Sequence, residues 1–174
     1  DGSYSYEGSD GSSGSGSSDG SGSWDDDQGN VSNWGADGSS SNTYADGSSD
    51  SNDGQGGGTW DDGQGNNSTW SADGSGSYTD TSGGSGSWNA DGSGTWDDGQ
   101  GNASTYNADG SGSMNYADGS SETWDNEGNW TFTDAGGETC TADDCATGEF
   151  PNDDGSTDTF NDDGSSSTTD EFGN

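Results

Sequence analysis

The sequence predicts an all-β repeat fold, and three observations support that prediction. Counted from Asp1 in steps of nine, the second position of each nonapeptide holds Gly in 19 of 20 cases, and Ala146 is the exception. The 18 aromatic residues amount to nearly one for each nonapeptide. Apolar residues show no helical spacing, because Gly, Asp, Ser and Asn dominate and neither Leu nor Ile occurs. A fixed period of this kind indicates a structural repeat.

Each nonapeptide is expected to form a turn followed by a short strand. Asp-Gly and Gln-Gly suit turns, because Gly adopts a positive φ without steric cost. The Ser, Thr and aromatic residues that follow favour a pleated, half-buried strand. Aromatic residues prefer the sixth position in odd-numbered nonapeptides, as Trp24 and Trp60 do, and the seventh in even-numbered ones, as Trp34 and Trp70 do. The full period is therefore 18 residues.

Two arrangements of these strands fit the period. In a β-solenoid, two strands make one 18-residue coil and like strands stack in parallel, so that the aromatic residues form ladders. In an antiparallel β-meander, successive strands pair through two-residue hairpins. The sixth and seventh positions of a uniform meander are expected to face opposite sides of the sheet. We therefore predict the solenoid, with the antiparallel meander as the alternative.

The repeat divides the chain into three parts. Residues 1–135 form a regular array, residues 136–153 form an irregular segment that contains Pro151, and residues 154–174 resume the repeat. The irregular segment holds both cysteines, Cys140 and Cys145, whose four intervening residues allow a local disulfide. Zinc is disfavoured, because a structural zinc site needs about four ligands and the chain has no His.

The charge of the chain excludes several classes of function. It has 35 acidic residues, no Lys, no Arg and no His, and hence a formal charge of -35. Nothing in it can neutralise nucleic-acid phosphates, and no apolar run is long enough for membrane insertion. No His or Lys can act as a general base, and every carboxylate pair sits in a repeated frame, so we do not expect an enzyme.

Clusters of Asp at the turns are the candidate metal site. Oxygen-rich turns are the ligands that Ca²⁺ prefers, and calcium is therefore the expected cofactor. The alternative interpretation is a solvated acidic edge that prevents strand pairing between molecules. The candidate ligands are Asp25, Asp26, Asp27, Asp61, Asp62, Asp97, Asp98, Asp153, Asp154, Asp162 and Asp163.

The stretch Asp91-Gly92-Ser93-Gly94-Thr95-Trp96 has Gly at the second and fourth positions. In this spacing and in its period, the chain resembles the RTX-type calcium β-roll of secreted bacterial adhesins and toxins. The resemblance implies a calcium-dependent solenoid. The calcium ligand of that family is a sixth-position Asp, and here Trp96 stands in its place.

Asn-x-Ser/Thr sequons provide candidate sites for glycans. Copying one repeat also copies its sequon, so the pattern by itself does not require glycosylation. The candidate residues are Asn30, Asn66, Asn67, Asn102 and Asn129.

Taken together, these features lead to the hypothesis of a structural protein. We expect a subunit of an extracellular fibre or cell-surface appendage, with copies of itself as partners in an end-to-end homopolymer and with glycans attached. The unbroken period and the lack of distinct capping repeats favour this hypothesis. The alternatives are a solenoid that binds an ice or mineral surface and a calcium-dependent, adhesin-like repeat.

Overall fold

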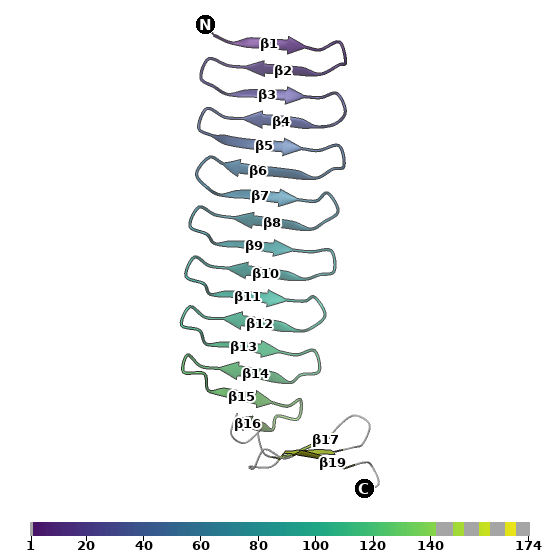
Figure 1. Ribbon diagram of the computed structural model, residues 1–174, viewed down its shortest axis with the longest axis vertical. Coiled ribbons are helices and arrows are strands. Elements are labelled where there is room, and N and C mark those ends of the chain that lie inside the picture. Colours follow the sequence, from purple (N-terminus) through teal and green to yellow (C-terminus); the bar gives the residue numbers. More distant parts are fainter. Residues whose placement is uncertain (1, 142–147, 152–156, 161–165, 170–174) are drawn as a thin grey trace. The chain divides into compact units, whose positions relative to one another are not determined.

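The computed structural model describes residues 2–141, 148–151, 157–160 and 166–169 (Figure 1). It confirms the all-β repeat: the described residues form 19 short strands and no helix. Strands β1 to β16 are hydrogen-bonded in chain order in one open sheet, and β17 to β19 form a separate three-stranded sheet. No helix long and apolar enough to cross a membrane occurs among these residues.

The chain divides into two compact units, residues 1–100 and 101–174. In the first unit, eleven strands of four or five residues follow one another, with turns that alternate between two edges (Figure 1). These strands are β1 (Tyr4–Glu7), β2 (Ser13–Gly16), β3 (Gly22–Asp25), β4 (Val31–Trp34), β5 (Ser39–Thr43), β6 (Ser49–Asp53), β7 (Gly58–Asp61), β8 (Asn67–Trp70), β9 (Gly76–Thr79), β10 (Ser85–Trp88) and β11 (Gly94–Asp97).

The second unit continues the same pattern of one strand in each nonapeptide. The expected boundaries at residues 136 and 153 stay a prediction. The strands of this unit are β12 (Ala103–Tyr106), β13 (Gly112–Asn115), β14 (Ser121–Trp124), β15 (Trp130–Thr133), β16 (Thr139–Thr141), β17 (Gly148–Pro151), β18 (Thr157–Phe160) and β19 (Ser166–Thr169).

Of the two arrangements that the sequence left open, the antiparallel meander is the one that forms. Tyr4 pairs with Gly16, and Gly22 pairs with Trp34, in antiparallel register. Each nonapeptide thus supplies one strand of a single sheet, and no parallel coil of two strands is seen among the described residues. Consecutive strands are joined by connections such as residues 8–12 and 17–21, which are longer than the expected two-residue hairpins.

The expectation that sixth- and seventh-position aromatic residues face opposite sides is wrong. Trp24 pairs with Ser32, and Trp34 pairs with Gly22, so paired residues are either both even-numbered or both odd-numbered. Side chains alternate between faces along a strand, and paired residues share a face. Since a repeat has nine residues, an odd number, the sixth position of an odd-numbered nonapeptide and the seventh of the next are both even-numbered. Both therefore lie on the same face.

The turns explain why Gly recurs at the second position. In residues 17–21, Gly20 has a φ of 92°, and its N–H donates to the carbonyl of Ser17 at 3.0 Å. An L-residue with a side chain rarely adopts this left-handed conformation. The recurrent Gly thus belongs to the turn, where the chain reverses between two strands of the meander.

No apolar side chain is buried among the described residues. The buried polar residues there are three serines, Ser12, Ser104 and Ser120. A sheet with no covering layer cannot draw on a hydrophobic core. Its order rests on the backbone ladder, on contacts between neighbouring strands within each face, and on hydrogen bonds in the turns.

Candidate binding face

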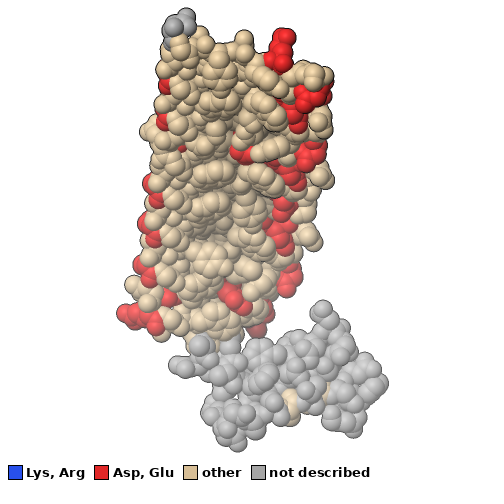
Figure 2. Space-filling view, turned by 45° about the horizontal axis from the view of Figure 1, so that its top comes forward, with Lys and Arg blue, Asp and Glu red and all other residues tan. Residues whose placement is uncertain are grey.

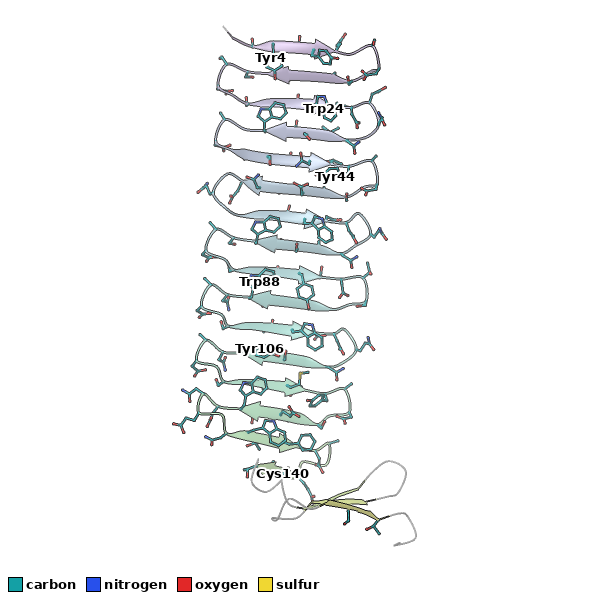
Figure 3. The ribbon with its side chains drawn as sticks, viewed as in Figure 1. Tyr4, Trp24, Tyr44, Trp88, Tyr106 and Cys140 are labelled. Atoms are coloured by element: carbon teal, nitrogen blue, oxygen red, sulfur yellow. The ribbon has the colours of Figure 1, made fainter. Side chains whose placement is uncertain are left out.

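In the first unit, the even-numbered residues form a face with two columns of aromatic side chains. The first column follows the sixth positions, and the second column is displaced toward the other edge (Figure 3). Tryptophans in both columns are 37% to 44% exposed, so neither column is covered. The first column contains Tyr6, Trp24, Trp60, Tyr78 and Trp96, and the second contains Tyr4, Trp34, Trp70 and Trp88.

Aromatic rings of both columns lie over a glycine of the neighbouring strand. A methyl group placed on Gly76 would overlap the indole of Trp88, its direct cross-strand partner. The Trp88 Nε1–H donates to the carbonyl of Gly74 at 2.8 Å, which fixes the indole across the adjacent strand. The indoles of Trp34, Trp70 and, in the second unit, Trp124 lie in the same way over their cross-strand partners Gly22, Gly58 and Gly112.

The second unit carries a comparable aromatic group. Tyr106 and Trp124 have ring centroids 5.7 Å apart, with planes tilted by 53°. Trp130 and Phe132, both on β15, have centroids 6.2 Å apart and nearly parallel planes. Such aromatic pairs stabilise a surface beyond the area that they bury.

A polar group on β5 and β6 interrupts the aromatic face of the first unit. Asp50 lies in the first column, between its cross-strand partners Asn42 and Trp60. Asn42 Nδ2 donates to Asp50 Oδ2 at 2.9 Å, and the Tyr44 hydroxyl donates to Asp50 Oδ1 at 2.6 Å. This hydrogen bond, followed by desolvation and the carboxylate charge, raises the pKa of Tyr44.

The second unit repeats this arrangement. The hexapeptide Tyr-Ala-Asp-Gly-Ser-Ser occurs at 44–49 and at 116–121, and an acid follows it each time, Asp50 and Glu122. Glu122 pairs with Met114 on one side and Phe132 on the other. Partial burial, followed by a hydrogen bond to Glu122, raises the pKa of Tyr116. Each unit thus has a carboxylate beside an aromatic ring and a tyrosine that donates to it.

The opposite face of the first unit carries hydroxyl groups in its central column. Thr69 Oγ1 and Ser77 Oγ, which stand on paired strands, are 2.9 Å apart. Equivalent bonds of 2.8–2.9 Å join Ser15 to Ser23, Ser51 to Thr59, and Ser87 to Thr95. These hydroxyl groups form hydrogen bonds with one another across paired strands, and so this face helps to stabilise the sheet.

Acidic side chains gather along the edges where the turns lie (Figure 2). In the Asp-Gly-Ser turns the carboxylate accepts hydrogen bonds within its own turn. Asp73 Oδ1 accepts from Ser75 Oγ at 2.6 Å and from the Ser75 N–H at 2.9 Å. The Ser75 hydroxyl, followed by its N–H, lowers the pKa of Asp73. These carboxylates therefore close the turns.

Of the acids proposed as calcium ligands, those that the structure describes occupy a second kind of turn. Asp26 Oδ1 accepts from the N–H groups of Gln28 and Asn30, and Asp26 Oδ2 accepts from Asn30 Nδ2. The Asn30 side chain and N–H lower the pKa of Asp26. Asp25, Asp61 and Asp97 each accept from an N–H two residues later, as do Asp62 and Asp98.

Among the described residues, no three acidic or cysteine side chains come together in a group that could hold a metal ion. The remaining candidate ligands, Asp153, Asp154, Asp162 and Asp163, lie outside the side chains that the structure describes. The calcium sites stay a prediction.

The sequon asparagines at 36-residue intervals have a structural role that the sequence reading missed. Asn66 Nδ2 donates to Asp62, and Asn66 Oδ1 accepts from the N–H of Thr81, in the next turn on the same edge. Asn30 bridges to Ala45 in the same way, and Asn102 Oδ1 accepts from the N–H of Ala117. Recurrence of Asn two residues before a sequon hydroxyl hid this role. The acid four residues earlier is a local signal for the bond within the turn, but not for the bridge to the next turn.

The other two sequons are placed differently. Asn67 begins β8, and Asn129 Nδ2 donates to Asp125 Oδ2 at 2.5 Å in its turn. Glycosylation at the five asparagines stays a prediction.

Cys140 lies on β16 and is disulfide-bonded. Its expected partner Cys145 lies outside the described residues.

Comparison with known proteins gives matches at the level of structure. No protein-family model and no curated protein matches the chain. The G-box domain of the microcephaly protein CPAP, for which a role in centriole elongation is suggested, aligns over 97% of this chain and 98% of its own, with a TM-score of 0.53 and 17% identity. This likeness shows a shared fold.

Two further structures align less closely. The TCP10c domain of Drosophila melanogaster Sas-4 aligns over 80% of this chain and 97% of its own, with a TM-score of 0.44 and 17% identity. The Drosophila SAS-4 TCP domain in complex with a proline-rich motif of Ana2 covers 80% of this chain and 88% of its own, with a TM-score of 0.33 and 14% identity.

These findings correct the expected function, partners and location. The chain was expected to be an extracellular or cell-surface fibre subunit that polymerises with copies of itself. Its fold is instead found in a domain with a suggested role in centriole elongation. A repeated open sheet therefore does not indicate an extracellular filament. The ice-binding, mineral-binding and adhesin-like alternatives were part of the same hypothesis of an extracellular protein, and they are wrong for the same reason. No comparison supports a calcium-bound glycoprotein.

Proposed function

We propose that the chain is a non-catalytic scaffold whose aromatic face binds an extended, proline-rich and basic segment of another protein. The observation that carries this proposal is the uncovered pair of aromatic columns. Rings such as Trp24 and Trp60 stay 43% and 44% exposed on a chain that is otherwise strongly polar. A contiguous exposed apolar surface bordered by polar residues is typical of an interaction site.

The spacing of the rings favours a polyproline II ligand. Trp60, Tyr78 and Trp96 stand on β7, β9 and β11, two strands apart from one another. Strands in a sheet are about 4.8 Å apart, so these rings repeat at roughly 9.6 Å. A polyproline II helix rises about 9.3 Å in each three-residue turn. Every third residue of such a segment can therefore cover one ring of the first column.

The charge of the chain indicates which residues the ligand carries at its non-proline positions. The chain has 35 acidic residues and no basic ones, and the acids line the edges beside the aromatic face (Figure 2). A ligand with Lys or Arg outside its proline positions is attracted to these edges, whereas an acidic ligand is repelled. A segment that already forms a polyproline II helix loses little conformational entropy when it binds to an aromatic-lined surface.

The proposal is tested by calorimetric titration with a synthetic peptide of four Pro-x-x triplets that carries Lys at both ends. The control peptide has Ala in place of Pro. Trp60→Ser is compared with Thr59→Ala, because these neighbours on β7 face opposite sides. We expect Trp60→Ser to weaken binding about tenfold and Thr59→Ala to leave it unchanged. Absence of binding to the wild-type chain, or equal effects of the two substitutions, would refute the scaffold function. Trp96→Ser provides a second ring variant, and circular dichroism checks folding.

A further inference from the structure

Asp50 departs from the pattern of its column. The residues on the intervening strands of the first column are otherwise small: Gly14, Ser32, Ser68 and Gly86. At the corresponding place on β6, a carboxylate stands directly across from Trp60. On the preceding strand, β5, the sixth position of the nonapeptide usually carries an aromatic ring, but here it holds Asn42.

The carboxylate is held in place and retains capacity to bind. Tyr44 and Asn42 each donate one hydrogen bond to it, one to each oxygen. An ionised carboxylate has about four acceptor positions, so two remain. The whole chain contains no Lys, Arg or His. Any cation that pairs with Asp50 must therefore come from outside the molecule.

The neighbouring ring suits the same cation. Trp60 is 44% exposed and is the direct cross-strand partner of Asp50. A guanidinium or ammonium group beside the carboxylate can also contact the face of the indole, which is the best of the aromatic partners for a cation. Recurrence of the arrangement at Glu122, with Phe132 as its cross-strand partner, indicates a repeated feature and not an isolated substitution.

We propose that Asp50 sets the specificity and the register of the ligand by binding an Arg or Lys three residues from the proline that covers Trp60. This inference rests on the proposed scaffold function. A residue one polyproline II turn from Trp60, about 9.3 Å along the column, lies over Asn42. From there a long basic side chain reaches Asp50, which is about one strand spacing away. The recognised pattern is a basic residue followed or preceded by prolines at steps of three.

The test compares peptides that differ only in the basic residue. The in-register peptides have Arg, two spacer residues, and then three prolines at every third position, in both chain directions. One control replaces Arg by Gln, and another moves Arg to a spacer position between prolines. We expect the wild-type chain to prefer the better in-register peptide over both controls roughly three- to tenfold, since an exposed ion pair and an exposed cation–π contact are each modest.

Three variants separate the local effect from general charge attraction. Asp50→Asn should reduce the preference for Arg to less than about twofold, and Asp50→Glu should restore it, because Glu122 stands at the equivalent place in the second unit. Asp27→Asn removes the same charge from an exposed turn residue whose φ of 59° suits Asn, and it should keep the preference. Equal behaviour of Asp50→Asn and Asp27→Asn overturns the inference while leaving the scaffold function intact. Failure of every peptide to bind the wild-type chain instead refutes the scaffold function itself.

Discussion

The ring of Tyr78 occupies the space in which a side chain of Gly86 would stand. The two residues are direct cross-strand partners on β9 and β10. A methyl group on Gly86 would lie within 3.1 Å of Tyr78 Cδ1 and Cζ, and closer still to Cε1. The aromatic face therefore depends on glycine at the positions that the rings cover.

Gly86→Ala is accordingly expected to destabilise the sheet by about 1–3 kcal/mol, because the added methyl group forces the ring aside. The three heavy atoms nearest to that methyl position all belong to the Tyr78 ring. In a Tyr78→Ala background the same substitution should cost at least about 1 kcal/mol less. Urea unfolding of the four chains of this double-mutant cycle measures the coupling. Equal costs in both backgrounds would show that the ring does not lie over Gly86.

The bridge made by Asn66 gives a second prediction. Asn66→Ala removes the bond to Asp62 and leaves the N–H of Thr81 without its acceptor. Loss of these two bonds should cost about 1–3 kcal/mol. Hydrogen exchange at the Thr81 amide should accelerate as well. Asn67→Ala, one residue along on β8, is the matched control, and exchange that is equally fast in both variants would contradict the bridge.

The turn carboxylates predict how stability depends on pH. The pKa values of Asp73 and its equivalents in other Asp-Gly-Ser turns are lowered from 3.8 by hydrogen bonds to Ser. A group whose pKa is lower in the folded state stabilises that state fully above its unfolded pKa. This contribution is lost as the pH falls below 3.8 through the folded-state values. The urea midpoint should therefore decrease as the pH is lowered through this range.

Ser75→Ala isolates the cause of that dependence. Removal of the hydroxyl should bring the pKa of Asp73 back toward its ordinary value, as measured by NMR titration of its carboxyl carbon. Ser77→Ala removes a strand hydroxyl that bonds to Thr69 instead, and it should leave the pKa of Asp73 unchanged. A pKa of Asp73 that does not respond to Ser75→Ala would rule out the turn hydrogen bond as its cause.

The bond from Tyr44 to Asp50 makes a spectroscopic prediction. It raises the pKa of Tyr44 above the ordinary value of 10.0. In Asp50→Asn, both the charge and the strong acceptor are lost, so Tyr44 should ionise at a lower pH than in the wild-type chain. Ultraviolet absorbance of phenolate during an alkaline titration records the change. Asp27→Asn controls for net charge, and a Tyr44 titration that is identical in all three chains would be inconsistent with the bond.

The sequence alone predicted the repeat, the all-β class and the turn-strand unit. Glycine at the second position is strong evidence for a turn, since the left-handed φ of residues such as Gly20 requires it. Choosing between solenoid and meander was harder, because position within the nonapeptide was read as if it defined the face. In an odd-length repeat that reverses direction, Trp24 and Trp34 share a face although their positions differ.

The role of the turn acids could be predicted only in part. The repeat placed the acidic residues at the turns, but a metal site and a solvated acidic edge would both produce the same clusters of Asp. The structure shows that Asp26 accepts hydrogen bonds from Gln28 and Asn30 in its own turn. The spacing of Asp and Ser at i and i+2 is a local signal for such turns. The bridge from Asn66 to Thr81 spans 15 residues and depends on the sheet register, so local sequence could not reveal it.

The most direct test of the account resolves the two faces of the sheet during binding. Two-dimensional NMR can follow the indole Nε1–H signals of Trp60 and Trp96 together with the methyl groups of Thr59 and Thr95, their neighbours on the opposite face. On addition of the in-register, proline-rich Arg peptide, we predict that the indole signals shift and the threonine methyl signals stay in place. Equal shifts on both faces, or shifts confined to the threonines, would contradict an aromatic binding face.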